Sequence, residues 1–132
     1  MKLGLVGAIA LLVLGSVLLA PSAGAGSGIP SECGGRYYAN IITGTPGDDT
    51  LTGSSNKDVI LGLGGNDTLI GNSGDDCLVG GDGDDVLDYA GPTGGGYSGN
   101  DYLVGGAGFD TAKQGTGTGK CFSIELLIGK AC

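Results

Sequence analysis

The chain has 132 residues, of which 31 are glycine, and it contains no histidine and no tryptophan. Its 14 acidic and six basic residues give a formal net charge of −8. This charge disfavours nucleic acid and anionic membrane surfaces as partners and favours cations, and the length suits one domain.

The N-terminus has the composition of an export signal. Lys2 supplies a positive charge, residues 3–19 form an uncharged apolar run, Pro21 interrupts that run, and Ala23-Gly24-Ala25 offers small residues at a cleavage site. We therefore expect residues 1–25 to be a signal peptide, and the product to be secreted without membrane insertion. The alternative is an uncleaved membrane anchor, although the apolar run is short for a membrane span.

Four cysteines are consistent with export to an oxidising compartment, where two disulfides are expected. They are Cys33, Cys77, Cys121 and Cys132. The favoured pairs are Cys33 with Cys77 and Cys121 with Cys132, but free or differently paired thiols stay open at this point. Residues 26–43 are interpreted as the mature N-terminal segment and a cap, in which Tyr37, Tyr38, Ile41 and Ile42 cover the open end of the following structure.

Residues 44–113 repeat with a period of nine. Seven copies begin with glycine, at Gly44, Gly53, Gly62, Gly71, Gly80, Gly96 and Gly105. The sixth column is aspartate in every copy: Asp49, Asp58, Asp67, Asp76, Asp85, Asp101 and Asp110. The eighth column is apolar: Leu51, Ile60, Leu69, Leu78, Leu87, Leu103 and Ala112. A short fixed period with one apolar and one carboxylate column is typical of a metal-binding β-solenoid.

In each copy, the first six residues favour a turn and the last three favour a strand whose middle side chain points inward. Two copies make one coil, so the prediction is an all-β parallel β-roll with strands on two opposite faces.

Residues 89–95 interrupt the period. A bulging loop would leave Asp101 on the opposite edge from Asp85, whereas a degenerate repeat would place both on one edge; the bulge is slightly favoured because Pro92 and its glycines suit no central strand. Residues 114–132 are interpreted as a C-terminal cap, with a closing strand from Phe122 to Ile128 and a solvated Glu125.

Stacked carboxylates explain why such an array needs a cation. Neighbouring coils lie about 4.8 Å apart, so aspartates two copies apart repel unless a cation lies between them. Oxygen ligands favour Ca²⁺ or Mg²⁺, and glycine turns that offer several carbonyls suit the larger Ca²⁺. Zinc is disfavoured without histidine or clustered cysteines.

The seven copies resemble the hemolysin-type calcium-binding nonapeptide repeats, the RTX family, with the pattern G-G-x-G-x-D-x-U-x. The resemblance implies several calcium ions between turns two copies apart, held by the sixth-column aspartates and by carbonyls around Gly44, Gly62, Gly71, Gly80, Gly96 and Gly105. The implied pairs begin with Asp49 and Asp67, Asp58 and Asp76, and Asp67 and Asp85. Lys57 places the Asp58 site in doubt. Fifth-column Asp48, Asp75 and Asp84 are close enough in sequence to reach the metal, but they are expected to point to solvent and supply charge.

These patterns predict an exported calcium-binding β-roll that folds on reaching extracellular Ca²⁺ and has a structural or adhesive role. The alternative is an accessory module of a secreted enzyme or toxin system. No catalysis is expected, because the chain lacks histidine, G-x-S-x-G and zinc motifs. Outward Val, Leu and Ile side chains suggest an apolar strip for self-association or an unidentified partner.

Overall fold

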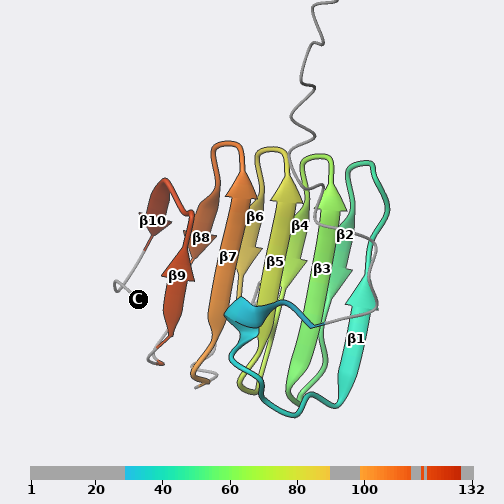
Figure 1. Ribbon diagram of the computed structural model, residues 1–132, viewed down its shortest axis with the longest axis vertical. Coiled ribbons are helices and arrows are strands. Elements are labelled where there is room, and N and C mark those ends of the chain that lie inside the picture. Colours follow the sequence, from blue (N-terminus) through green and yellow to red (C-terminus); the bar gives the residue numbers. More distant parts are fainter. Residues whose placement is uncertain (1–28, 90–98, 114–116, 118, 129–132) are drawn as a thin grey trace, which may run out of the picture.

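The computed structural model describes residues 29–89, 99–113, 117 and 119–128. These residues form a β-solenoid in which consecutive strands alternate between two parallel sheets that face each other (Figure 1). Apart from a short 3-10 turn, η1 (Ser31–Cys33), every regular element in this part of the chain is a strand. The prediction of an all-β parallel roll is confirmed.

Each sheet takes every second strand of the chain. Sheet A has the order β1-β3-β5-β7-β9, and sheet B has the order β10-β8-β6-β4-β2. The sheet A strands are β1 (Asn40–Thr43), β3 (Asp58–Gly64), β5 (Cys77–Asp82), β7 (Tyr102–Ala107) and β9 (Lys120–Phe122). The sheet B strands are β2 (Thr50–Thr52), β4 (Thr68–Ile70), β6 (Val86–Asp88), β8 (Thr111–Lys113) and β10 (Leu126–Ile128).

The pairing of the strands confirms that the interruption of the repeat is a bulge and not a degenerate copy. Leu51 lies beside Leu69, and Ile60 lies beside Leu78, so one coil corresponds to two copies. Across the interruption, Leu78 lies beside Leu103 in sheet A, and Leu87 lies beside Ala112 in sheet B. The sixth copy therefore follows the fourth, and Asp101 lies on the opposite edge from Asp85. Residues 90–98 lie outside the described residues.

A single inward column forms the core, as predicted. The eighth-column side chains pack between the sheets: Ile60, Leu69, Leu78, Leu87, Leu103 and Ala112 are buried, and Leu51 packs against them. Tyr89, the first residue of the interruption, is also buried in this core with 2% exposure. Its burial was not predicted, because it lies outside the columns.

The N-terminal segment covers part of the outer face of sheet A, instead of closing the end of the first coil. Cys33 is bonded to Cys77 of β5, with 5.5 Å between their Cα atoms, which confirms that predicted pair. Tyr38 is buried beside them and donates its hydroxyl hydrogen to the Cys33 carbonyl at 2.6 Å. Tyr37 and Ile41, expected in the cap, are 89% and 57% exposed. The predicted apolar strip is thus covered around Val59 by the chain itself.

The strands continue beyond residue 113. The predicted closing strand from Phe122 to Ile128 is instead the end of β9, a turn, and β10 on the other sheet. Leu127 takes the inward position beside Ala112 but stays 41% exposed, because nothing described lies over this last coil. Cys121 is also disulfide-bonded, and its predicted partner Cys132 lies outside the described residues. In the described part of the chain, no helix is long and apolar enough to span a bilayer.

Candidate metal centre

The sixth-column aspartates lie at the starts of the strands, where each turn enters a sheet. Six of the seven are at most 3% exposed: Asp58, Asp67, Asp76, Asp85, Asp101 and Asp110. Asp49, in the first coil, is partly exposed. Such burial of carboxylates is costly unless hydrogen bonds or a cation compensate for it. Their partners therefore decide what the site can hold.

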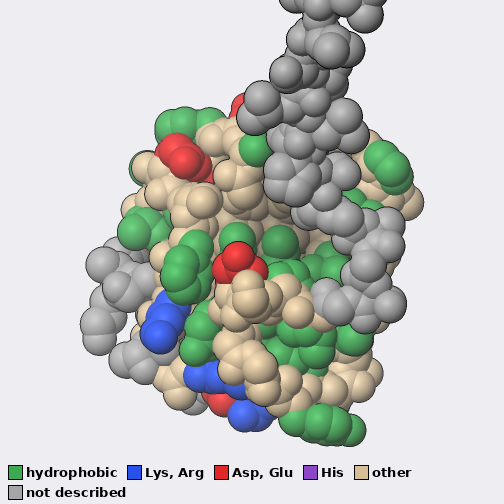
Figure 2. Space-filling view, in the orientation of Figure 1, with side chains coloured by type: hydrophobic (Ala, Val, Ile, Leu, Met, Phe, Trp, Pro, Cys, Tyr) green, Lys and Arg blue, Asp and Glu red, His purple; other side chains and the backbone are tan. Residues whose placement is uncertain are grey.

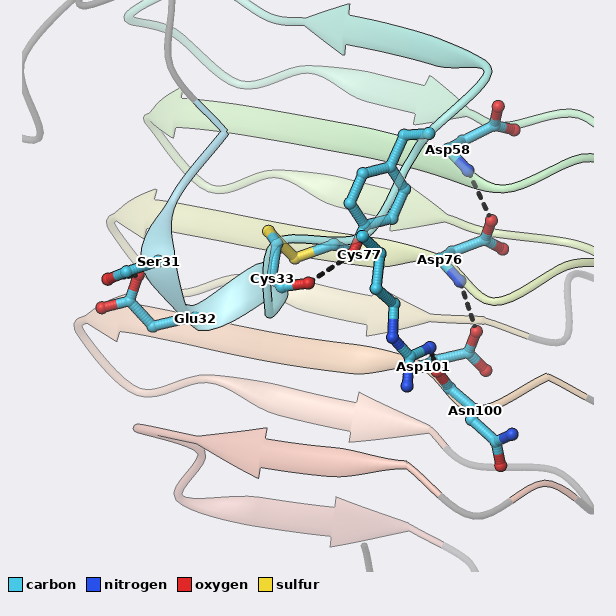
Figure 3. The surroundings of a disulfide bond; sticks show 10 residues. Ser31, Glu32, Cys33, Asp58, Asp76, Cys77, Asn100 and Asp101 are labelled. Atoms are coloured by element: carbon cyan, nitrogen blue, oxygen red, sulfur yellow. Dashed lines mark hydrogen bonds between the residues drawn. A yellow bond between two sulfur atoms is a disulfide. The ribbon is translucent and has the colours of Figure 1, made fainter.

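The aspartates form two ladders, one along each edge of the roll. We call Asp58, Asp76 and Asp101 the sheet A ladder, and Asp49, Asp67, Asp85 and Asp110 the sheet B ladder. In both, one carboxylate oxygen accepts the backbone N–H of the aspartate in the preceding coil. Figure 3 shows these hydrogen bonds in the sheet A ladder. These five hydrogen bonds are all 2.8–2.9 Å long and join Asp49–Asp67, Asp67–Asp85, Asp85–Asp110, Asp58–Asp76 and Asp76–Asp101. The predicted stacking of aspartates two copies apart is therefore present.

Two further residues that sequence reasoning missed take part in the ladders. Asn40 is aligned with Asp58 and donates its side-chain amide to that carboxylate at 2.5 Å. Glu125 is exposed, as expected, and its carboxylate also accepts the N–H of Asp110 at 2.8 Å. Asn40 lies two positions before Ile42, and Glu125 lies two positions before Leu127. The same spacing separates the aspartate column from the inward apolar column, so it could have revealed both residues.

The second carboxylate oxygen divides the turns into two classes. In the first two copies it is hydrogen-bonded within its own turn: Thr45 N–H donates to Asp49 Oδ2 at 2.6 Å, and Ser54 N–H donates to Asp58 Oδ2 at 2.5 Å. In four other copies this oxygen is buried without a hydrogen-bond partner. These oxygens are Oδ2 of Asp67, Asp76, Asp85 and Asp110.

Backbone conformation accounts for the difference. The second-column residue has a positive φ in the four turns with an unpartnered oxygen: Leu63 (85°), Asn72 (73°), Gly81 (120°) and Gly106 (126°). Thr45 and Ser54 do not, and their N–H groups reach the carboxylate. A positive φ is unfavourable for leucine. The backbone conformation at the second column therefore decides whether the second carboxylate oxygen is hydrogen-bonded within its own turn.

Glycine carbonyls lie beside the same oxygens. A Cβ atom added to Gly44 would lie 2.7 Å from both Asp49 Oδ2 and the carbonyl oxygen of Gly62. The same overlap recurs one coil further on, where a Cβ on Gly62 would collide with Asp67 Oδ2 and the Gly80 carbonyl. The first column must therefore be glycine, because a side chain would fill the space that the carboxylate and the next coil's carbonyl share. Of the predicted carbonyl positions, Gly96 lies outside the described residues.

Fifth-column carboxylates also join coils. Asp48 accepts the N–H of Asn66 at 2.7 Å, and Asp84 accepts the N–H of Phe109 at 2.8 Å. Asp75 accepts the N–H of Asn100 and pairs with the Lys57 ammonium at 2.7 Å. Asp48 and Asp84 are exposed, as expected, and Asp75 is partly exposed; their links between coils were not predicted. Lys57, which had cast doubt on Asp58, binds Asp75 instead.

Burial changes the acidity of the ladder. It raises the pKa of Asp76 to about 8 and those of Asp85 and Asp101 to about 6, from an ordinary value of 3.8. The hydrogen bond from the preceding coil's N–H partly offsets this rise, and neighbouring carboxylates add to it for Asp76 and Asp85. Burial likewise raises the pKa values of Asp67 and Asp110.

The donor set fits a hard cation with oxygen ligands. Among the described residues, no three Asp, Glu or Cys side chains converge as a metal cluster, so any bound ion must also use backbone carbonyls. The carbonyls of Gly80 and Gly105 lie beside the buried Oδ2 atoms of Asp67 and Asp85, and the Ser123 carbonyl lies beside that of Asp110. Each of these carbonyls can share such an ion. Calcium accepts six to eight oxygens in flexible geometry, which suits this mixture of carboxylate and carbonyl groups.

Comparison with known proteins agrees with this chemistry. A family model described as the RTX calcium-binding nonapeptide repeat matches the chain in four copies, over residues 34–69, 52–87 and 95–112. These segments cover more than half of the sequence. No curated protein and no solved structure gives a significant match.

We predict that Leu63→Gly stabilises the roll. Leucine at φ 85° is strained, and glycine removes this strain at some cost in chain entropy, for a net gain of about 0.5–1 kcal/mol. Thr45→Gly is the matched control in the same column, where no positive φ requires glycine. Urea denaturation in calcium should show a higher unfolding free energy for Leu63→Gly alone. An equal change in both variants would contradict the strain.

The metal-free roll should become less stable as the pH rises from 4 to 8. The folded pKa values of Asp76 and Asp85 lie above the unfolded value, so their contribution is fully present below pH 4 and is lost as the pH passes 6 and then 8. The pKa of Asp75 is lowered by its hydrogen bond from Lys57, so Asp75 titrates below this window.

Calcium should reverse this trend, because ligands must be deprotonated before they bind a metal. The check is the β-signal in far-ultraviolet circular dichroism between pH 4 and pH 8, on protein stripped of metal and on protein saturated with calcium. A metal-free β-signal that grows as the pH rises would show that the aspartates are not buried as described.

Proposed function

Because the chain belongs to the RTX calcium-binding nonapeptide repeat family, we propose that it is an exported protein whose β-roll folds when it meets extracellular Ca²⁺. The observation that carries the proposal is the set of buried aspartate oxygens without a hydrogen-bond partner, one in each of four turns. A buried, unpartnered acceptor destabilises a fold unless another group binds it. A cation between coils would satisfy these oxygens.

We assign the calcium ligands to the aspartates of the two ladders, together with neighbouring glycine carbonyls. The strongest candidates are the four with an unpartnered oxygen: Asp67, Asp76, Asp85 and Asp110. Asp101 continues the sheet A ladder, and Glu125 continues the sheet B ladder. Asp49 and Asp58 are weaker candidates, because their second oxygens already accept hydrogen bonds from Thr45 and Ser54.

Calcium would supply positive charge and coordination positions between the coils. The protein's part is to hold the carboxylates in register through the N–H of the preceding coil, and to keep the turns narrow enough for carbonyls to approach. Without the ion, stacked carboxylates at about 4.8 Å repel each other and favour unfolding or protonation. Folding would thus be coupled to the calcium concentration outside the cell.

Export and a structural or adhesive role complete the proposal. The signal-like residues 1–25, the disulfide between Cys33 and Cys77 and the acidic composition support an extracellular protein. A closed calcium site between coils leaves no obvious place for a reacting substrate, so we propose that the module has no catalysis of its own. A role as accessory module of a secreted enzyme or toxin system is compatible with the same architecture.

Calcium should fold the protein reversibly. Far-ultraviolet circular dichroism during a calcium titration should show a cooperative gain of β-signal that magnesium does not reproduce and a chelator removes. A β-rich spectrum that is the same with calcium and with chelator would overturn the proposal.

Asp85→Asn should raise the calcium midpoint of this transition by at least about tenfold, since losing even an outer partner of a metal costs that much affinity. Asp82→Asn is the matched control: it removes the same charge from the same turn, but Asp82 is exposed. A midpoint that shifts equally in both variants would mean that the effect is one of net charge and not of ligation.

Export with cleavage after Ala25 is tested separately. When the full chain is expressed in a secreting host, the product in the medium should begin at Gly26 by N-terminal sequencing. A product that stays in the membrane and retains Met1 would support the anchor instead.

A further inference from the structure

The two edges of the roll differ in charge. The turns that lead into sheet B, residues 44–49, 62–67, 80–85 and 105–110, contain seven acidic residues and no basic ones. The turns that lead into sheet A, residues 53–58, 71–76 and 96–101, contain four acidic residues and one lysine, Lys57. An incoming cation therefore meets a more negative edge at sheet B.

The N-terminal segment adds a second cation to the sheet A edge. The Arg36 guanidinium donates to the carbonyl of Asn100 at 2.8 Å and lies 3.6 Å from the Asp75 carboxylate. It also stacks over the Tyr102 ring, 4.7 Å from its centre. Arg36 follows Cys33 by three residues, and the disulfide joins Cys33 to Cys77, the neighbour of Asp76 in the chain. Figure 3 shows this disulfide beside the sheet A ladder of Asp58, Asp76 and Asp101. Figure 2 shows basic side chains gathered at the lower end of this face, where the strands of sheet A begin.

The ladders differ as well. The sheet B ladder runs from Asp49 to Glu125, whereas the sheet A ladder ends at Asp101, because Gly119 takes the next position beside it. Of the four unpartnered aspartate oxygens in the described part of the chain, three belong to the sheet B ladder and one, that of Asp76, to the sheet A ladder. The more negative charge, the longer ladder and the larger number of unpartnered oxygens are therefore all found at the sheet B edge.

We propose that the two edges bind calcium unequally: the sheet B edge is the high-affinity edge, while Arg36 and Lys57 brace the sheet A edge and weaken calcium binding there. This inference rests on the proposed function and adds to it an order of binding. The N-terminal segment, held by the disulfide, then supplies positive charge to the sheet A edge. The stability of that edge therefore depends less on bound calcium.

The test is isothermal titration of calcium into the purified protein with its disulfides intact. The wild-type protein should show two phases. In Arg36→Gln/Lys57→Gln, the weaker phase should shift about threefold to tenfold toward lower calcium, because two nearby positive charges are gone. Lys113→Gln is the control: its side chain is 49% exposed against 50% for Lys57, and it pairs with Asp88, which belongs to neither ladder. It should leave both phases in place.

A double variant that titrates like the wild-type protein would overturn the inference while leaving calcium binding intact. Absence of calcium binding in every variant and in the wild type would instead overturn the proposed function, and the inference with it. If the double variant does not fold in calcium, Asp76→Asn and Asp85→Asn decide the matter. Asp76→Asn should remove only the weaker phase and Asp85→Asn should weaken the stronger one, and the reverse assignment would refute the order.

Discussion

The hydrogen bonds that join the sixth-column N–H groups to carboxylates of the next coil, along both ladders, are the interaction on which the roll depends. It fixes the register between coils, because a slip of one residue would move every aspartate away from its donor and every inward leucine to the surface. It also places the carboxylates in a row, with repulsion along each edge. The same bond that orders the structure therefore creates its need for a cation.

The core is too narrow to remove that need. One inward apolar side chain per copy lies between the sheets, and the last one, Leu127, is still 41% exposed. The turns are built from glycine, which loses the most backbone freedom on folding. The first-column glycines cannot be replaced to recover this entropy, because the next coil's carbonyl occupies the space of a side chain. Narrow turns, which suit the metal, thus limit what the apolar core can contribute.

Much of this arrangement could be predicted from the sequence, because a nine-residue period fixes strands, inward residues and the aspartate column together. The period alone left the interruption at residues 89–95 open; Pro92 and its glycines slightly favoured the bulge that the register confirms. Asn40 and Glu125 were missed because neither is an aspartate, although each takes the place of one. The positive φ of Leu63 and Asn72 was also missed, because it follows from the shape of the turn and runs against the preferences of those residues. The position of Arg36 depends on contacts with Asp75 and Tyr102, which are distant in sequence and follow no period.

The disulfide and the proposed calcium ions would act on opposite sides of the folding equilibrium. Linking Cys33 to Cys77, 44 residues apart, restricts the unfolded chain and so acts whether or not metal is present. A cation that binds only the folded roll stabilises it in proportion to the logarithm of its free concentration. The two contributions are therefore independent in origin, and one cannot replace the other. The link orders the N-terminal segment over sheet A and leaves the sheet B edge, the more acidic one, to respond to calcium.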